Sequence, residues 1–185
     1  NMFGMSLLER QINTFRNCGI HNIIVVSGYK DETINFLNIK KYKNPNFDDT
    51  NMVETLFCVD KEMDDRVIIS YGDIIFEKKV LTSLINSGED YSVVIDKNWR
   101  KYWESRFTDP LIDAESLILD SMNNIIEIGQ TTKNIDDIQG QYIGLMKFQG
   151  SGLKFLRNFY QKTKEESKKT GENPLNPNID FKKSY

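Results

Sequence analysis

Hydrophobic side chains recur at helical spacing near the start of the chain. Ile12 and Phe15 follow Ser6 and Glu9, a pair with the spacing of a helix capping box. Gly19 comes next, where a helix C-cap requires a left-handed residue. The pattern therefore predicts a helix that begins at Ser6 and stops before Gly19.

Short runs of apolar and β-branched residues alternate with further amphipathic segments along the chain. The runs that predict buried strands are 21–26, 67–71, 91–95 and 141–148. The segments that predict helices are 31–37, a helix from Asn51, 78–87 and 153–160, while 40–49 predicts a loop. Strands and helices in this alternation predict an α/β fold with three layers around a mostly parallel central sheet.

The pattern changes from Leu117 onwards. Residues 116–119 and 125–128 flank a turn-rich segment, which predicts a β-hairpin inserted into the α/β fold. The sequence after about residue 168 is polar and contains Pro174 and Pro177, so we expect a solvated loop there.

Composition narrows the classes of protein. The chain has 185 residues and is 39% hydrophobic, which suits one domain spanning 1–185. Its net charge is −3 with both signs interspersed, so we expect no nucleic-acid partner. Cys18 and Cys58 lack metal-site spacing and His21 is the sole histidine, which disfavours a zinc site, a disulfide framework and a catalytic triad. No apolar run spans a membrane and no signal peptide is evident, so the prediction is a cytoplasmic protein.

Gly72 and Asp73 follow directly after the predicted strand 67–71. A carboxylate at the carboxyl end of a strand in an open α/β sheet faces the crevice where ligands bind. Mg²⁺ commonly uses one or two such carboxylates together with substrate phosphates. The alternative is an ordinary strand-ending turn, because Gly and Asp dominate turns.

Two other segments have the same kind of position. Ser27, Gly28 and Tyr29 follow a predicted strand, and Asn51 begins a predicted helix, where backbone N–H groups and a side-chain amide can meet a nucleotide. Their structural alternatives are a loop turn and an N-cap. Gly150 opens a Gly-Ser-Gly segment that lacks the remainder of a phosphate-loop motif, and it is interpreted as a helix N-terminus.

Aromatic and charged residues mix in residues 96–113, immediately after a predicted strand. Asp96 and Trp99 could form part of an aromatic and acidic wall for a cationic amine, and Arg106 could bind an oxyanion. The alternative is that these aromatic side chains pack under a long loop or form an interface between copies, as in a homodimer.

Several segments in the same order resemble nucleotidyltransferases. They are Ser-Leu-Leu-Glu-Arg-Gln-Ile (6–12), Gly-Ile-His-Asn-Ile-Ile-Val-Val-Ser-Gly-Tyr (19–29), Thr-Asn-Met-Val-Glu-Thr-Leu (50–56) and Tyr-Gly-Asp (71–73). Three more resemble phosphocholine and aminoalkylphosphonate cytidylyltransferases, some of which are fused to phosphoenolpyruvate mutase domains, so a fusion domain is one of the open arrangements. They are Val-Val-Ile-Asp (93–96) with Trp99, Asp-Pro-Leu-Ile-Asp-Ala-Glu (109–115) and Gln-Tyr-Ile-Gly-Leu-Met-Lys-Phe (141–148).

The resemblance implies a transfer of CMP from CTP to a small phosphate or phosphonate, such as phosphocholine or 2-aminoethylphosphonate, with Mg²⁺ as cofactor. It implies that Asp73 is the catalytic, metal-binding aspartate. The residues that it places at the nucleotide are Ser27, Gly28, Tyr29, Asn51, Met52 and Gly72. The residues that it places at the acceptor are Asp96, Trp99, Arg106 and Tyr142.

The family pattern also implies segments outside these residues. A first strand with a Gly-x-Gly-x-Arg triphosphate loop is expected before residue 1, and a second acidic metal-binding segment after Tyr185. Two alternatives to a cytidylyltransferase stay open at this point. One is a sugar-1-phosphate nucleotidyltransferase that uses another nucleotide, and the other is a non-catalytic nucleotidyltransferase-like binding domain.

Overall fold

A computed structural model describes residues 4–175 and 177–183. The chain divides into two compact units, one made of Asn1–Ser92 with Lys147–Tyr185 and one made of Val93–Met146. The boundary falls inside two strands, β4 (Tyr91–Asp96) and β7 (Gln141–Gln149). The expectation of one domain over 1–185 stays a prediction.

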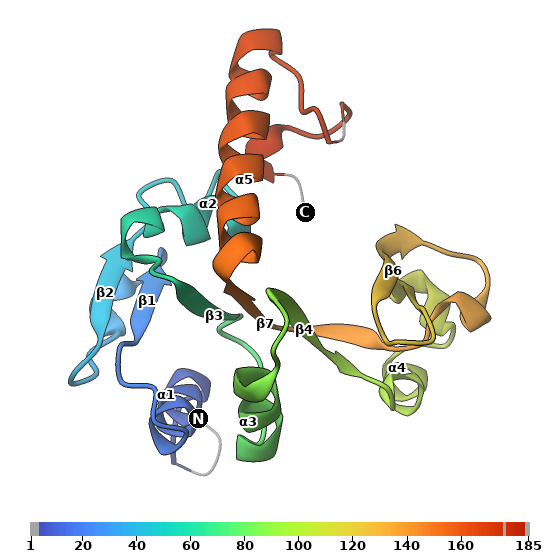
Figure 1. Cartoon of the computed structure of the whole chain (residues 1–185), viewed down its shortest axis with the longest axis horizontal. Coiled ribbons are helices and arrows are strands. Elements are labelled where there is room, and N and C mark those ends of the chain that lie inside the picture. Colours follow the sequence, from blue (N-terminus) through green and yellow to red (C-terminus); the bar gives the residue numbers. More distant parts are fainter. Residues whose placement is uncertain (1–3, 176, 184–185) are drawn as a thin grey trace. The chain divides into compact units, whose positions relative to one another are not determined.

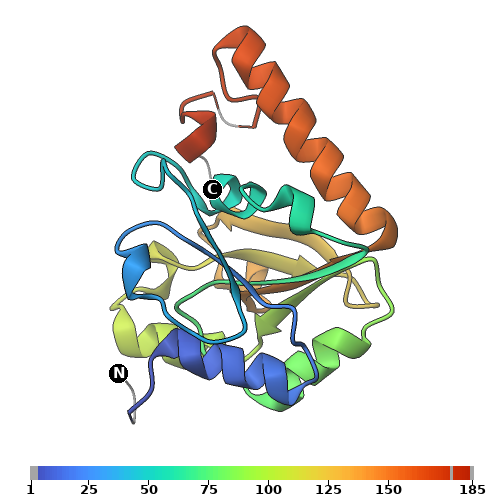
Figure 2. The same cartoon turned by 90° about the vertical axis from the view of Figure 1, so that its left-hand side faces the viewer.

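The first unit contains most of the α/β pattern. Its longer helices are α1 (Leu7–Asn17), α2 (Met52–Phe57), α3 (Lys78–Asn86) and α5 (Gly150–Thr170), and its strands include β1 (Ile24–Ser27), β2 (Lys40–Lys43) and β3 (Arg66–Ser70). Within this unit, α1 and α3 lie on one side of β1 and β3, and α2 lies on the other side (Figures 1 and 2). This arrangement gives the unit the three layers that the sequence predicts.

The helix ends follow the local sequence. The Ser6 side chain accepts a hydrogen bond from the Glu9 backbone N–H, so α1 begins with the predicted cap. Gly19 has φ +82°, a left-handed conformation that favours glycine after a helix. Phe15 of α1 packs edge-on against Phe76, with ring centroids 5.6 Å apart, and both rings are buried. The hydrophobic pattern of α1 thus encodes both the helix and its buried face.

Two predictions in the first unit were wrong. The helix predicted for 31–37 is only the short 3₁₀ helix η1 (Asp31–Thr33), because Ile34 is extended and Asn38 adopts a left-handed φ of 58°. The loop predicted for 40–49 begins with strand β2, which pairs in parallel with β1. Three of the four β2 residues are lysines, so the sequence showed no apolar strand signal.

Ion pairs explain how a lysine-rich strand is tolerated at a sheet edge. Lys43 lies 2.9 Å from Asp31, and Lys40 lies 2.6 Å from Glu62. The hydroxyl of Tyr42 also donates to Glu62, at 2.6 Å. Two acidic residues outside the strand therefore offset the charges of β2.

The second unit contains the predicted hairpin. Strands β5 (Glu115–Leu119) and β6 (Ile125–Thr131) pair antiparallel, and the side chain of Asp120 accepts hydrogen bonds from Met122 and Asn124 in the turn. Helix α4 (Trp99–Arg106) precedes the hairpin. A small core of Trp99, Ala114 and Ile138 stabilises this unit.

The sheet prediction is confirmed in part. Strands β3, β7 and β4 form a three-stranded sheet in that order, while β1 with β2 and β5 with β6 form separate two-stranded sheets. Strands β1 and β2 pair in parallel, as the prediction requires.

In the described residues, four further 3₁₀ helices lie between or after these elements: η2 (Asp60–Glu62), η3 (Pro110–Ile112), η4 (Ile135–Asp137) and η5 (Phe181–Lys183).

Candidate nucleotide-binding site

The end of β1 forms the first part of the candidate site. Ser27 is the last residue of β1, and its hydroxyl donates to the Tyr42 carbonyl of β2 at 3.2 Å. A Cβ on Gly28 would overlap Phe47, so only glycine lets the chain pass this ring. Tyr29 is 72% exposed, with its ring centroid 6.4 Å from that of Phe47. The loop after β1 therefore packs closely on the loop after β2.

Asn44 organises this second loop, and the sequence reasoning missed it. The residue is 3% exposed. Its Nδ2 donates to the hydroxyls of Thr50 at 2.8 Å and Thr55 at 2.9 Å, and its Oδ1 accepts from the backbone N–H of Asn46 at 3.0 Å. Its own backbone N–H donates to the Ser27 carbonyl at 2.8 Å. Asn44 thus connects the end of β1 to helix α2, and the Asn-Pro pair at 44–45 is the turn signal that could have found it.

Asn51 and Met52 stand at the start of α2. The Asn51 Oδ1 accepts from the backbone N–H groups of Val53 at 3.0 Å and Glu54 at 2.9 Å, so the helix starts as predicted and Asn51 is its N-cap, the structural alternative considered for this residue. The backbone N–H of Asn51 donates to the Lys182 carbonyl at 2.6 Å. Met52 is 38% exposed. The proposed contact of this helix start with a nucleotide stays a prediction.

Helix α5 holds α2 in place. Tyr160 stacks on Phe57 with centroids 3.6 Å apart, and its hydroxyl donates to a Glu54 carboxylate oxygen at 2.6 Å. Lys164 donates to the other Glu54 oxygen at 2.8 Å. Burial and the hydrogen bond to Glu54 raise the pKa of Tyr160, so the phenol stays protonated. The helix that Asn51 caps is therefore held by its contacts with α5.

Asp73 lies in the turn that follows β3, as the sequence predicts. Both Gly72 and Asp73 are exposed. The turn is held from α1, because the Gln11 Nε2 donates to the carbonyls of Tyr71 at 2.9 Å and Ile74 at 2.7 Å. Gln11 is only 5% exposed. The apolar positions of α1 gave no signal for this contact, since Gln11 reads as a polar residue of the helix surface.

The four residues predicted to contact the acceptor belong to the second unit. The Asp96 Oδ1 accepts from the Asn98 backbone N–H at 2.7 Å, at the start of α4. Trp99 is 4% exposed and its ring N–H donates to the Ile138 carbonyl at 3.1 Å, which favours the packing interpretation of this residue. The Arg106 guanidinium lies 5.0 Å from the Phe107 ring centroid. Tyr142 lies in β7 and is half-buried.

Known proteins resemble this chain in sequence and in fold. No protein-family model matches the chain. A CTP:phosphoglutamine cytidylyltransferase from Campylobacter jejuni is 38% identical over 172 residues, which cover 84% of this chain and 65% of that protein. The described part of the chain has the fold of nucleotidyltransferases.

Solved structures share this nucleotidyltransferase fold at low sequence identity. The inositol-1-phosphate CTP transferase of T. maritima superposes with a TM-score of 0.62 at 13% identity, over 84% of this chain and 62% of that one. The 4-diphosphocytidyl-2C-methyl-D-erythritol synthase of Anaerococcus prevotii gives a TM-score of 0.57 at 18% identity, over 88% and 66% of the two chains. The chain spans 65% of the length of its curated relative, so these likenesses establish the fold of the part described here.

A magnesium ion in this fold would take acidic side chains of the chain as ligands. Among residues 4–175 and 177–183, no group of three or more His, Cys, Asp or Glu side chains could hold a metal ion. Asp73 is a single exposed carboxylate at a strand end. Mg²⁺ accepts such an arrangement, because it keeps water molecules and uses substrate phosphates as further ligands.

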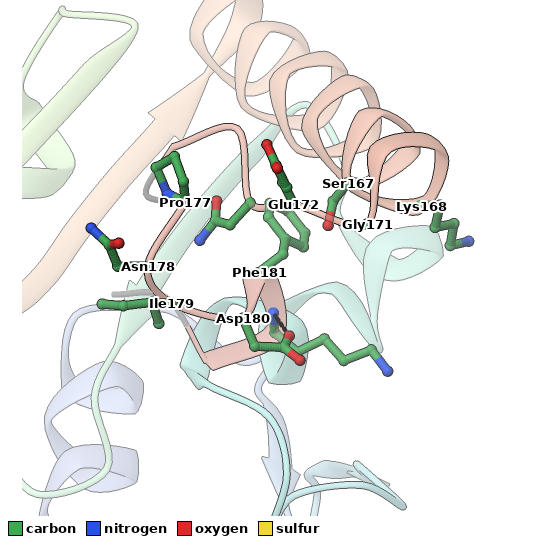
Figure 3. A pocket seen from close by; sticks show the side chains of 11 residues that line it. Ser167, Lys168, Gly171, Glu172, Pro177, Asn178, Ile179, Asp180 and Phe181 are labelled. Atoms are coloured by element: carbon green, nitrogen blue, oxygen red, sulfur yellow. Dashed lines mark hydrogen bonds between the residues drawn. The ribbon is translucent and has the colours of Figure 1, made fainter.

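A cavity of about 400 Å³ lies elsewhere in the first unit. Its walls come from the last turn of α5, from residues 171–173 just after that helix, and from residues 177–182 (Figure 3). No residue of the predicted site lines this cavity.

Within the described part of the chain, no helix has the length and apolar character needed to cross a bilayer.

Proposed function

We propose that this chain is part of a cytidylyltransferase that transfers CMP from CTP to a small phosphorylated acceptor and releases pyrophosphate. The observation that carries this proposal is the 38% identity to a CTP:phosphoglutamine cytidylyltransferase across 84% of the chain. The exposed carboxylate of Asp73 after β3 supports it. The cytoplasmic location predicted from the sequence belongs to the same proposal.

In this reaction an acceptor phosphate or phosphonate oxygen attacks the α-phosphorus of CTP in line with the leaving group. One phosphorus–oxygen bond forms, and the bond between the α-phosphorus and the bridging oxygen of pyrophosphate breaks. The nucleophile is already an anion, so the chain needs no histidine as a general base. Positioning and electrostatic stabilisation supply most of the rate in such reactions.

The residues of the chain would divide this work between them. Asp73 would hold a magnesium ion, which when bound offsets the negative charge that develops on the phosphates. The segment at Ser27, Gly28 and Tyr29 would contact the nucleotide through a loop that Phe47 and Asn44 keep in one conformation. Asn51 would contribute the backbone at the start of α2.

The acceptor is proposed more coarsely. The curated relative acts on phosphoglutamine, and the sequence resemblance points to phosphocholine or 2-aminoethylphosphonate. All three carry an anionic phosphorus group on a small molecule that contains nitrogen. Arg106 and the aromatic rings around it would then serve the acceptor, with Asp96 and Tyr142 as further candidates.

Pyrophosphate release by the full-length protein tests the proposal. The assay combines CTP and Mg²⁺ with phosphoglutamine, phosphocholine or 2-aminoethylphosphonate, and in parallel offers UTP, dTTP or GTP with sugar 1-phosphates. Release with CTP and one of the three acceptors is expected. Release only with another nucleotide, or nucleotide binding without any release, would contradict the proposal and favour a sugar-1-phosphate enzyme or a binding domain.

Asp73→Asn tests the role of the carboxylate. We expect turnover to fall by about 100-fold or more, the magnitude found when a main electrostatic contact to the transition state is removed. Asp136→Asn, which changes another exposed carboxylate, is the matched control and should keep normal turnover. Equal turnover in Asp73→Asn and the wild type would remove Asp73 from the mechanism.

A further inference from the structure

The carboxamide of Gln11 is committed to one turn of the protein. Its Nε2 donates to the carbonyls of Tyr71 at 2.9 Å and Ile74 at 2.7 Å. Its Oε1 accepts from the Ser70 hydroxyl at 3.2 Å. Two of these partners are backbone carbonyls and one is a side-chain hydroxyl, and all three belong to residues 70–74, the segment that includes Gly72 and Asp73.

The position of Gln11 makes this contact unusual for a helix residue. Gln11 is on α1 and 60 residues from Tyr71 along the chain, and its side chain is 5% exposed. Buried amide groups are normally paired, because an unpaired one costs about 1–3 kcal/mol. The buried face of α1 therefore carries an amide whose N–H groups donate to one carbonyl before Asp73 and one after it.

We propose that Gln11 is a positioning residue for Asp73. By binding the carbonyls before and after Gly72 and Asp73, it fixes the width of the turn and so the direction in which the carboxylate leaves the backbone. This inference rests on the proposed function for the role of Asp73, while the anchoring of the turn stands on the hydrogen bonds alone.

Only an amide fits this role. A glutamate at position 11 would have no donor and would place a carboxylate against two carbonyl oxygens. A methionine has a similar length and fills the same space, but it offers neither a donor nor a strong acceptor. Gln11→Met is therefore the substitution that removes the hydrogen bonds with the least change in packing.

The control is the neighbouring residue on the same helix. Ile12 is 2% exposed and its side chain has no polar atom that could bind the turn. Ile12→Val removes one buried methylene group and costs about 0.5–1.5 kcal/mol. It reproduces a loss of stability in α1 without removing a hydrogen bond to residues 70–74.

The experiment measures kinetics and hydrogen exchange on the full-length protein at a temperature where every variant is folded. For Gln11→Met we expect kcat to fall by about 10- to 100-fold, as for residues that orient metal ligands, with the KM for CTP within about twofold of the wild type. Amide exchange in the peptide that covers residues 71–76 should become roughly tenfold faster. Ile12→Val should change neither quantity.

Coupling to Asp73 distinguishes positioning from general damage. In the Asp73→Asn background, Gln11→Met should lower the residual kcat by less than about twofold, because two residues that act as one unit are not additive. A full additional loss there, or an equal loss in Ile12→Val, would overturn the proposal. So would a normal kcat in Gln11→Met when Asp73→Asn is inactive.

The two proposals fail in different ways. Normal turnover in Asp73→Asn would overturn the role of Asp73 and with it the positioning role of Gln11. Unchanged hydrogen exchange of residues 71–76 in Gln11→Met would overturn the anchoring of the turn, whatever the activity assay shows. Faster exchange confined to this peptide, together with the loss of kcat, supports the proposal.

Discussion

Asn44→Ala removes the residue that ties the end of β1 to α2. The asparagine side chain makes three hydrogen bonds, to the hydroxyls of Thr50 and Thr55 and from the backbone N–H of Asn46. At 3% exposure, water cannot replace these partners without opening the loop. The substitution therefore tests whether one buried amide holds the loop that packs on Gly28.

The magnitude follows from the three bonds. A hydrogen bond contributes about 1 kcal/mol to stability, so their sum is about 3 kcal/mol. The two threonine hydroxyls keep other partners, because Thr50 donates to the Asn46 carbonyl at 2.7 Å and Thr55 to the Asn51 carbonyl at 3.1 Å. The Asn46 N–H is the group left without its acceptor. We expect the free energy of unfolding to fall by about 2–3 kcal/mol.

Urea unfolding monitored by tryptophan fluorescence and far-ultraviolet circular dichroism measures this loss. Asn46→Ala is the matched control, since it removes an exposed asparagine side chain from the same loop and should change stability by less than about 0.5 kcal/mol. Binding of CTP should weaken in Asn44→Ala at temperatures where the protein stays folded. A loss below about 0.5 kcal/mol, equal to that of the control, would refute the reasoning.

Two further predictions concern other contacts of the first unit. Tyr160→Phe removes the donor to Glu54 and should cost about 1.5 kcal/mol in urea unfolding, whereas Tyr29→Phe, an exposed residue, should cost less than about 0.5 kcal/mol. Hydrogen bonds from Lys40 and Tyr42 lower the pKa of Glu62, so its stabilisation is present above the ordinary value of 4.5 and is lost as pH falls through the lower folded pKa. Urea unfolding from about pH 6 to 3 should show a smaller acid-induced loss in Glu62→Gln than in the wild type; equal losses would contradict this assignment.

Elements with a strong local pattern were predicted well. The cap at Ser6 and the N-cap at Asn51 both form as expected, because capping depends on residues three positions apart. The hairpin of β5 and β6 and the strands β3, β4 and β7 likewise follow their apolar periodicity. Fold class was accessible because alternating strands and helices have few ways to pack.

Elements whose stability comes from distant partners were not predicted. The lysine-rich strand β2 exists because β1 supplies its hydrogen-bond partners and Asp31 and Glu62 supply opposite charges. The segment after Asp31 has helical composition, yet the left-handed residue Asn38 and the route back to β2 end it after one turn. The intrinsic preference of a residue for helix or strand contributes less free energy than such tertiary contacts, which therefore decide the structure of these segments.

The sequence alone determined the positions of Asp73, of the loop after β1 and of the cap at Asn51, since each follows from its place at the end of a strand or the start of a helix. Only the tertiary structure revealed the residues that hold them. Gln11 and Asn44 are polar residues whose hydrogen bonds join segments that are distant or irregular in sequence. A single buried amide leaves no periodic pattern in the sequence, so its hydrogen-bond partners are seen only in the folded structure.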